Sequence, residues 1–428
     1  MAGGVQPIRA GRRLDMRNKN WPNKNRMQPA LSRRALLLGA SALVAGCSSH
    51  PQTDAPAGGF FSLIDNSAES AATGSLSSPL KIALLLPLSA PADAGRIASD
   101  LMGASQLALI EVNKPGVSMV TKDTAGTADG ASAAARAALA EGAELIIGPL
   151  LAVEVAATKV VAAPANVPVL AFSSDRSVAG NGAFLLSFLA GAEVSRIVSY
   201  AAAQGSRRFA ALVPATPYGA LVDQAFRAAV AFAGGQLAGI ERFQPDPLGM
   251  NAASMRIASR LSGRKVAGAA PDALLIAGGA DVLPAFGTLL PQAGINPAAL
   301  RMLGTGAWEY PDVSLIPAFI GGRFAAPDPS GFNAFADRFS KTYGTRPVRI
   351  AGLAFDAITM AVALADGPAG TRFSLANLTR ASGFAGVDGL FRLKSDGTSE
   401  RSLAVLEVAL AGPRLAEAAP VAFEAVAF

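Results

Sequence analysis

The 428-residue sequence is poor in cysteine and histidine: its one cysteine is Cys47 and its one histidine is His50. The chain beyond residue 50 therefore has neither a thiol nor an imidazole. That part of the chain therefore cannot form disulfides, zinc sites with Cys or His ligands, or catalytic Cys-His or Ser-His-Asp groups. No motif indicates a catalytic carboxylate pair or a Ser-Lys dyad either. We therefore predict a non-catalytic protein with no metal and no cofactor.

Long hydrophobic runs are also missing, although 51% of the residues are hydrophobic. No stretch reaches the roughly 18 consecutive apolar residues of a membrane-spanning helix. The net charge of +6 comes from residues 1–34, where nine Lys or Arg and one Asp give +8 and leave 6 − 8 = −2 for all later residues. A basic groove for phosphate groups is therefore not expected in the folded part, and we predict no nucleic-acid partner.

Residues 1–46 have the pattern of a secretory signal. A basic region ends in Ser32-Arg33-Arg34, an apolar run covers residues 35–45, and small residues precede Cys47. Such an apolar run is too short to span a bilayer but suits a cleaved signal helix. The sequence Leu-Val-Ala-Gly-Cys resembles a bacterial lipobox, and Ser-Arg-Arg resembles a twin-arginine signal. We therefore predict cleavage before Cys47 and a lipid anchor on its thiol.

Two points about this segment stay open. Met27 is an alternative start that would give a shorter, more ordinary signal. The anchor could lie in the inner or the outer membrane. An Asp directly after the cysteine would retain a lipoprotein in the inner membrane, and Ser48, which stands there instead, permits the outer membrane. Residues 47–80 are rich in Ser, Ala, Gly and Pro and lack apolar periodicity, so we predict a flexible tether.

From residue 81 onward, short apolar strands alternate with amphipathic helices. We expect strands at residues 82–86, 117–122, 145–147, 169–172, 184–188, 209–213, 237–243, 273–277, 301–303, 390–393 and 403–408. We expect helices at residues 95–112, 129–139 (with Asp129 as N-cap), 193–203, 220–232, 331–344 and 350–366. Several strands are apolar on both faces, which is typical of parallel strands covered by helices on both sides.

This alternation predicts an α/β fold of two doubly wound parallel-sheet lobes joined by a multi-crossover hinge. We divide the chain after the tether into lobe 1, residues 81–190 plus 325–395, and lobe 2, residues 191–324 plus 396–428. Residues 321–327, with Gly321 and Gly322, are predicted to cross between the lobes. Ligands of such folds lie at the carboxyl ends of the strands.

Short segments in a specific order point to a family. They are KIALLLPLS at residues 81–89, DTAGT at 123–127, IGPL at 147–150, PVLAFS at 168–173 and PYG at 217–219, followed by the Gly321-Gly322 pair. Together they resemble the type I periplasmic binding proteins, which include the leucine/isoleucine/valine receptors of ABC transporters. The lipobox, Asp123-Thr124 and FSSD at 172–175 are more similar to the penicillin-binding protein activator branch, whose lipoproteins bind and stimulate peptidoglycan synthases.

The resemblance implies a ligand site between the lobes, on loops that follow the strands. The first-lobe candidates are Ser89, Leu150, Ala152, Ser173, Ser174 and Asp175. The second-lobe candidates are Tyr218, Gly278, Gly279, Thr305 and Trp308. Each polar candidate also has an ordinary structural alternative: Ser173 and Ser174 could cap a helix, Asp175 could lie in a surface turn, and Tyr218 could be a half-buried turn aromatic.

One departure from the family affects the choice of function. Its amino-acid receptors usually hold the α-carboxylate with a Ser after Gly-Pro and a Thr in the next loop, whereas Ala152 and Asp175 or Arg176 stand near those places here. We therefore rank first a periplasmic, lipid-anchored activator that docks on a peptidoglycan synthase (penicillin-binding protein). The alternative is a solute receptor that delivers a branched-chain or other amino acid to an ABC permease.

The predicted anchor can be tested directly. Cys47→Ser removes the only thiol that could carry the lipid, so the variant is expected in the soluble periplasmic fraction, whereas the unchanged chain stays with the membranes. Membrane fractionation measures the difference. A variant that still needs detergent for its release contradicts the prediction.

Overall fold

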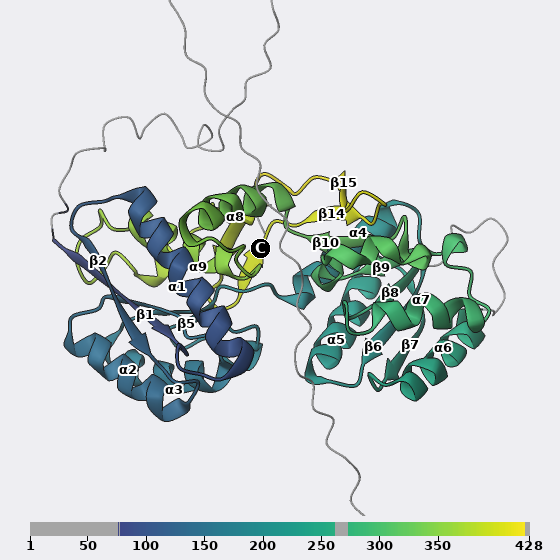
Figure 1. Cartoon of the computed structure of the whole chain (residues 1–428), viewed down its shortest axis with the longest axis horizontal. Coiled ribbons are helices and arrows are strands. Elements are labelled where there is room, and N and C mark those ends of the chain that lie inside the picture. The colour runs from purple at the N-terminus through teal and green to yellow at the C-terminus, as the bar shows by residue number, and fades with distance from the viewer. Residues whose placement is uncertain (1–75, 77, 262–272, 424–428) are drawn as a thin grey trace, which may run out of the picture. The chain divides into compact units, whose positions relative to one another are not determined.

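The computed structural model describes residue 76 and residues 78–261 and 273–423 (Figure 1). The predicted signal, Cys47 and almost all of the predicted tether lie outside these residues. In the described part, no helix combines the length and the apolar character needed to cross a membrane. The described residues form two large sheets with helices on both faces, and one small antiparallel sheet.

Within the described residues, the first sheet has five parallel strands in the order β2-β1-β3-β4-β5. Its strands are β1 (Leu80–Leu86), β2 (Val117–Asp123), β3 (Leu145–Ile147), β4 (Val169–Ala171) and β5 (Ala183–Leu185). Alternate residues of β1 face opposite sides: Leu84 packs in the cluster with α1 (Ala92–Val112) and α9 (Ala351–Ala363). Leu85 packs in the cluster with α2 (Ala128–Ala140) and α3 (Ala152–Ala162). This double covering explains strands that are apolar on both faces.

The second sheet, in the same described residues, has seven strands in the order β15-β14-β10-β9-β8-β6-β7. They are β6 (Arg208–Pro214), β7 (Gln236–Phe243), β8 (Ala273–Ile276), β9 (Arg301–Gly304), β10 (Arg323–Ala326), β14 (Ala404–Glu407) and β15 (Arg414–Glu417). β14 pairs antiparallel with both β10 and β15, and all the other pairs in this sheet are parallel. The covering helices are α4 (Ala190–Ala203) and α5 (Pro217–Phe232) on one face, and α6 (Pro247–Leu261) and α7 (Leu283–Gln292) on the other (Figure 1).

The small sheet joins the first lobe. Its antiparallel strands are β11 (Phe384–Gly386), β12 (Gly389–Leu393) and β13 (Ser399–Arg401). Phe384 and Phe391 belong to the same core cluster as α1, α9 and α8 (Pro329–Tyr343). The shorter helices are α10 (Leu375–Leu378), η1 (Ala163–Ala165), η2 (Arg176–Val178), η3 (Pro297–Ala299), η4 (Gly306–Trp308), η5 (Pro311–Leu315) and η6 (Pro317–Phe319).

The sheets confirm the predicted fold class of two parallel-sheet lobes with several crossovers. We call the first sheet, its helices, α8 to α10 and the small sheet the first lobe, and the second sheet with α4 to α7 the second lobe. Within the described residues the chain passes between them at 186–189, 327–328 and 402–403. The predicted crossover at 321–327 was wrong in its position, because most of it is β10, a strand in the interior of the second sheet.

Two predictions about helices also need correction. The N-cap of α2 is Thr127, whose hydroxyl accepts a hydrogen bond from the Gly130 amide at 3.0 Å, and Asp129 lies inside the first turn. The helices α3, α6, α7 and α10 were not predicted. In α7, Pro284 and Pro291 conceal the helical pattern, although Pro284 is tolerated because it stands in the first turn.

The corrected cap gives a test of this part of the fold. Thr127→Ala leaves the Gly130 amide without its acceptor and is expected to lower the free energy of unfolding by about 1 kcal/mol. Thr127→Ser keeps the hydroxyl and is the matched control, with most of the stability retained. Chemical denaturation followed by circular dichroism measures both variants. Equal losses in the two variants would show that the hydroxyl does not cap α2.

Candidate functional site

The first-lobe candidates make local contacts at the ends of their strands. Ser173 is buried, and its hydroxyl accepts a hydrogen bond from the Asp175 amide at 3.2 Å. Asp175 caps η2 by accepting a hydrogen bond from the Ser177 amide at 2.9 Å. The amide of Ser89, just after β1, donates to an oxygen of Asp123 at 3.2 Å. The bonds of Ser173 and Asp175 are those of a strand-end turn, whereas the Ser89 bond joins the ends of β1 and β2. Direct ligand contact by these residues stays a prediction.

The second-lobe candidates Tyr218 and Thr305 come together. Tyr218 lies in the first turn of α5 and Thr305 follows β9, and their hydroxyl oxygens lie 2.9 Å apart. Burial raises the pKa of Tyr218 to about 12, so its hydroxyl stays neutral at any physiological pH. Trp308, by contrast, is fully buried beneath this region, and its indole N–H donates to the Ile276 carbonyl at 3.1 Å. Trp308 therefore serves the core.

A pocket of about 250 Å³ opens beside Tyr218 and next to two of the crossovers. Its walls are formed by Phe188, Ala190, Glu193, Tyr218, Gly306, Ala307, Glu309, Ala326, Pro327 and Arg349. Of the ligand-binding residues predicted from the sequence, Tyr218 is in this described wall. Thr305 lies directly behind it through the hydroxyl contact. Ser89, Leu150, Ser173, Ser174 and Asp175 are not among the described residues that line it.

Glu193 places a buried carboxyl group in the pocket wall. It lies in the first turn of α4, is only 8% exposed, and accepts a hydrogen bond from the Gly306 amide at 2.9 Å. Burial raises its pKa to about 7, and the negative charge of Glu309 adds to this rise, although the Gly306 bond opposes it. Near neutral pH, therefore, Glu193 exists in both its protonated and its charged form.

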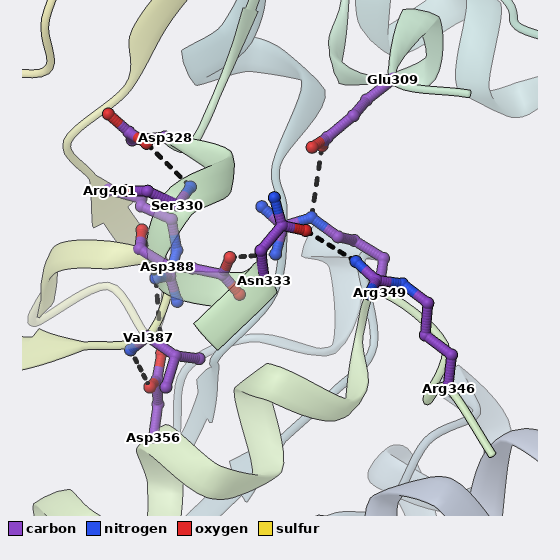
Figure 2. A network of polar contacts seen from close by, with 10 residues as sticks. All are labelled: Glu309, Asp328, Ser330, Asn333, Arg346, Arg349, Asp356, Val387, Asp388 and Arg401. Carbon is purple, nitrogen blue, oxygen red and sulfur yellow. Dashed lines mark hydrogen bonds and ion pairs between the residues drawn. The ribbon is translucent and has the colours of Figure 1, made fainter. Parts of the chain in front are cut away.

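Glu309 and Arg349 form an ion pair that joins the two lobes. Glu309 follows η4 in the second lobe, Arg349 precedes α9 in the first, and Arg349 Nε lies 3.2 Å from Glu309 Oε2. Burial raises the pKa of the Glu309 carboxyl, and the charge of Arg349 opposes that rise. The Arg349 guanidinium also lies over the ring of Phe332, 4.3 Å from its centroid. Figure 2 shows Glu309 and the polar residues around Arg349.

The network continues from Arg349 into the first lobe (Figure 2). Arg349 Nη1 pairs with Asp388, which is fully buried in the turn between β11 and β12. Arg401 of β13 donates to the Asp388 carbonyl at 3.0 Å and lies 3.5 Å from a carboxyl oxygen of Asp356. The Phe188 ring of the first crossover lies near both guanidinium groups, at 5.5 Å from Arg349 and 5.4 Å from Arg401.

Sequence reasoning missed Glu193, Glu309 and Arg349. A signal was present for Glu193, because it is a charged residue on the apolar face of a helix, in phase with Val194, Ile197 and Val198. No comparable signal marks Glu309 or Arg349, which lie in loops about 40 residues apart in sequence. Among the described residues, no group of three or more His, Cys, Asp or Glu could hold a metal ion.

Comparison with known proteins places this site in a familiar fold. Residues 79–413 match the family described as periplasmic binding protein. A similar solved structure is a putative branched-chain amino acid ABC transporter from Rhodospirillum rubrum, with a TM-score of 0.68 and 22% identity over 79% of this chain and 99% of that one. A substrate-binding protein from Desulfitobacterium hafniense in complex with Leu has a TM-score of 0.57 and 17% identity over 79% and 100%.

A further similar structure is a branched-chain amino acid transporter from Rhodopseudomonas palustris, with a TM-score of 0.62 and 19% identity over 79% of this chain and 95% of that one. At these identities the likeness shows the fold alone. A search of curated proteins finds no match to this sequence. The chemistry of the pocket must therefore be read from its own residues.

The raised pKa of Glu193 predicts a pH dependence of stability. Because the pKa in the folded state, about 7, lies above the ordinary value of 4.5, protonation favours folding. This contribution is complete below about pH 4.5 and is lost as the pH rises through 7. Glu193→Gln should therefore gain roughly 3 kcal/mol relative to the unchanged chain between pH 4.5 and pH 8.

Denaturation at both pH values measures the gain. The control is Glu400→Gln, because Glu400 pairs with Arg392 at a partly exposed position on β13. The control should change little at either pH. If Glu193→Gln keeps a constant offset from the unchanged chain across this range, Glu193 is already charged in the folded state and the prediction is wrong.

Proposed function

The chain belongs to the periplasmic binding protein family, and from this we propose that it is the solute-binding component of an ABC transporter. The observation that carries the proposal is the pocket beside the crossovers, lined by Tyr218, Glu193, Glu309 and Arg349. It combines apolar walls with a few polar groups, which is the usual composition of a small-molecule site. Its volume, about 250 Å³, is suited to a small solute.

The similar solved structures support this proposal by the ligands bound in them. One is in complex with Leu, and another, from R. palustris, is a solute-binding protein in complex with benzoate. We propose a non-catalytic role, periplasmic location and delivery of the solute to a permease. A lipid anchor on Cys47, if it lies in the inner membrane, would keep the protein at the membrane that holds its permease.

The activator role on a peptidoglycan synthase, which the sequence placed first, becomes the second candidate. Its sequence basis included FSSD at 172–175, where Ser173 and Asp175 bond to their own turn. A docking protein needs no buried ligand pocket, whereas a solute receptor does. The ion pair between Glu309 and Arg349 also links the lobes beside the pocket, so a bound solute could alter it and thereby favour one arrangement of the lobes.

The substitution Tyr218→Ala tests the transport role through solute uptake by cells. A strain that lacks the gene and carries the Tyr218→Ala chain is expected to lose at least tenfold in uptake of one of four labelled solutes: leucine, glutamate, benzoate or putrescine. The cause would be the loss of an aromatic wall and of the hydroxyl bonded to Thr305. Tyr343→Ala is the matched control, because Tyr343 ends α8 and is not among the described residues that line the pocket.

Cell-wall integrity is scored in the same strains by sensitivity to a cell-wall antibiotic. The transport role predicts an intact wall. A deletion strain that takes up all four solutes normally but has a weakened wall contradicts the transport role and supports the activator role.

A further inference from the structure

The polar side of the pocket is richer in carboxyl groups than in cations. The side chains of Glu193 and Glu309 both line it, and Arg349 is the one basic side chain in the described wall. Behind Arg349, the same network contains two more carboxyl groups, Asp388 and Asp356, and one more guanidinium group, Arg401. Four carboxyl groups thus lie near two guanidinium groups. Burial raises the pKa of Glu193 and of Asp356, so protons neutralise part of this negative charge, and a bound cation would favour the charged forms instead.

One carboxyl oxygen of Glu193 can still accept a hydrogen bond. Its Oε2 accepts the Gly306 amide, while its Oε1 has no hydrogen-bond partner among the described residues. The side chain is more than nine-tenths buried and still forms part of the pocket wall. A buried carboxyl group that faces a cavity with a free oxygen is costly unless a donor comes to it. A ligand nitrogen would be such a donor.

Arg349, in contrast, is not free to receive an anion. Its Nε pairs with Glu309, its Nη1 pairs with Asp388, and its plane lies over Phe332. Its Nη2 lacks a partner in the described residues but is buried away from the open space. A ligand carboxylate would have to displace Glu309, which would leave a second buried carboxyl group unpaired. The pocket therefore disfavours anionic solutes.

Aromatic rings complete the lining. Tyr218 and Phe188 form part of the wall, and the negative face of an aromatic ring attracts a cation. The ring of Phe188 already lies 5.5 Å from the Arg349 guanidinium and 5.4 Å from that of Arg401, so Tyr218 is the wall ring with no guanidinium described near it. Carboxyl groups together with aromatic rings are a combination that suits amines and guanidines.

We propose that the solute is a small organic cation, namely an amine or a guanidine that carries no carboxylate. Its nitrogen binds between Glu193 and Glu309. This inference rests on the proposed solute-binding function and specifies its substrate class. The family's amino-acid ligands carry a carboxylate as well. In the described wall the basic side chain, Arg349, is paired with Glu309 and Asp388 and its remaining Nη2 is buried, so a ligand carboxylate meets no accessible cationic partner there.

The test is isothermal titration calorimetry on the full chain, with agmatine and putrescine as cationic probes and leucine and benzoate as comparison solutes. We expect an amine to bind, and Glu193→Gln and Glu309→Gln each to weaken its binding roughly 10- to 100-fold, because each removes a charged hydrogen-bond acceptor. Glu400→Gln, a change on β13, should leave the affinity unchanged. Circular dichroism of each variant establishes that it is folded.

The failures of this inference and of the proposed function can be told apart. If leucine or benzoate binds, loses its affinity in Tyr218→Ala, and neither amine binds, the solute-binding function stands and the cation inference is wrong. If amine binding is unchanged in Glu193→Gln, the assignment of the nitrogen to this site is wrong. If none of the four solutes binds, the cation inference is wrong and the proposed function loses its support.

Discussion

The pairing of the partly buried Arg349 guanidinium with two carboxylates is the interaction on which the arrangement of the pocket depends. Arg349 pairs with Asp388, which has no exposed surface, and with Glu309 from the other lobe. Asp388, which is fully buried, would be costly by several kcal/mol without this partner, and the partly buried Glu309 by less. Arg349 therefore allows Asp388 to close the turn between β11 and β12 and Glu309 to stand in the pocket wall. The remaining carboxyl group, Glu193, has no such partner among the described residues, and its raised pKa reflects this.

The fold and the pocket have different physical origins. Two parallel sheets with helices on both faces need strands such as β1, in which Leu84 and Leu85 point into opposite cores. Many sequences satisfy this requirement, so solved structures of only 16% to 22% identity share the fold. The pocket depends on a few side chains brought together at the crossovers. A shared fold therefore does not fix the solute, and the polar residues of each pocket decide it.

Much of the architecture could be predicted from local pattern. Runs such as residues 145–147 predicted β3 with its observed bounds, because a strand buried on both faces has a clear sequence signature. β10 was missed because Gly321 and Gly322 precede it and Pro327 follows it, which is typical of a loop. Of the candidate site, Tyr218 was predicted and lines the pocket. Of the predicted first-lobe residues, Ser173 and Asp175 bond within their own turn, because turn-forming and ligand-binding residues are of the same types.

The sequence by itself determined the α/β class, the alternation of strands and helices, and the absence of thiol and imidazole chemistry after residue 50, because these follow from residue types and local periodicity. Only the tertiary structure decided which charges meet. Glu193, Glu309, Arg349 and Asp388 are distant in sequence, and no local pattern relates them. Their contacts exist because the chain crosses between the lobes and returns, and burial at those crossings then sets their pKa values and the kind of solute that the pocket favours.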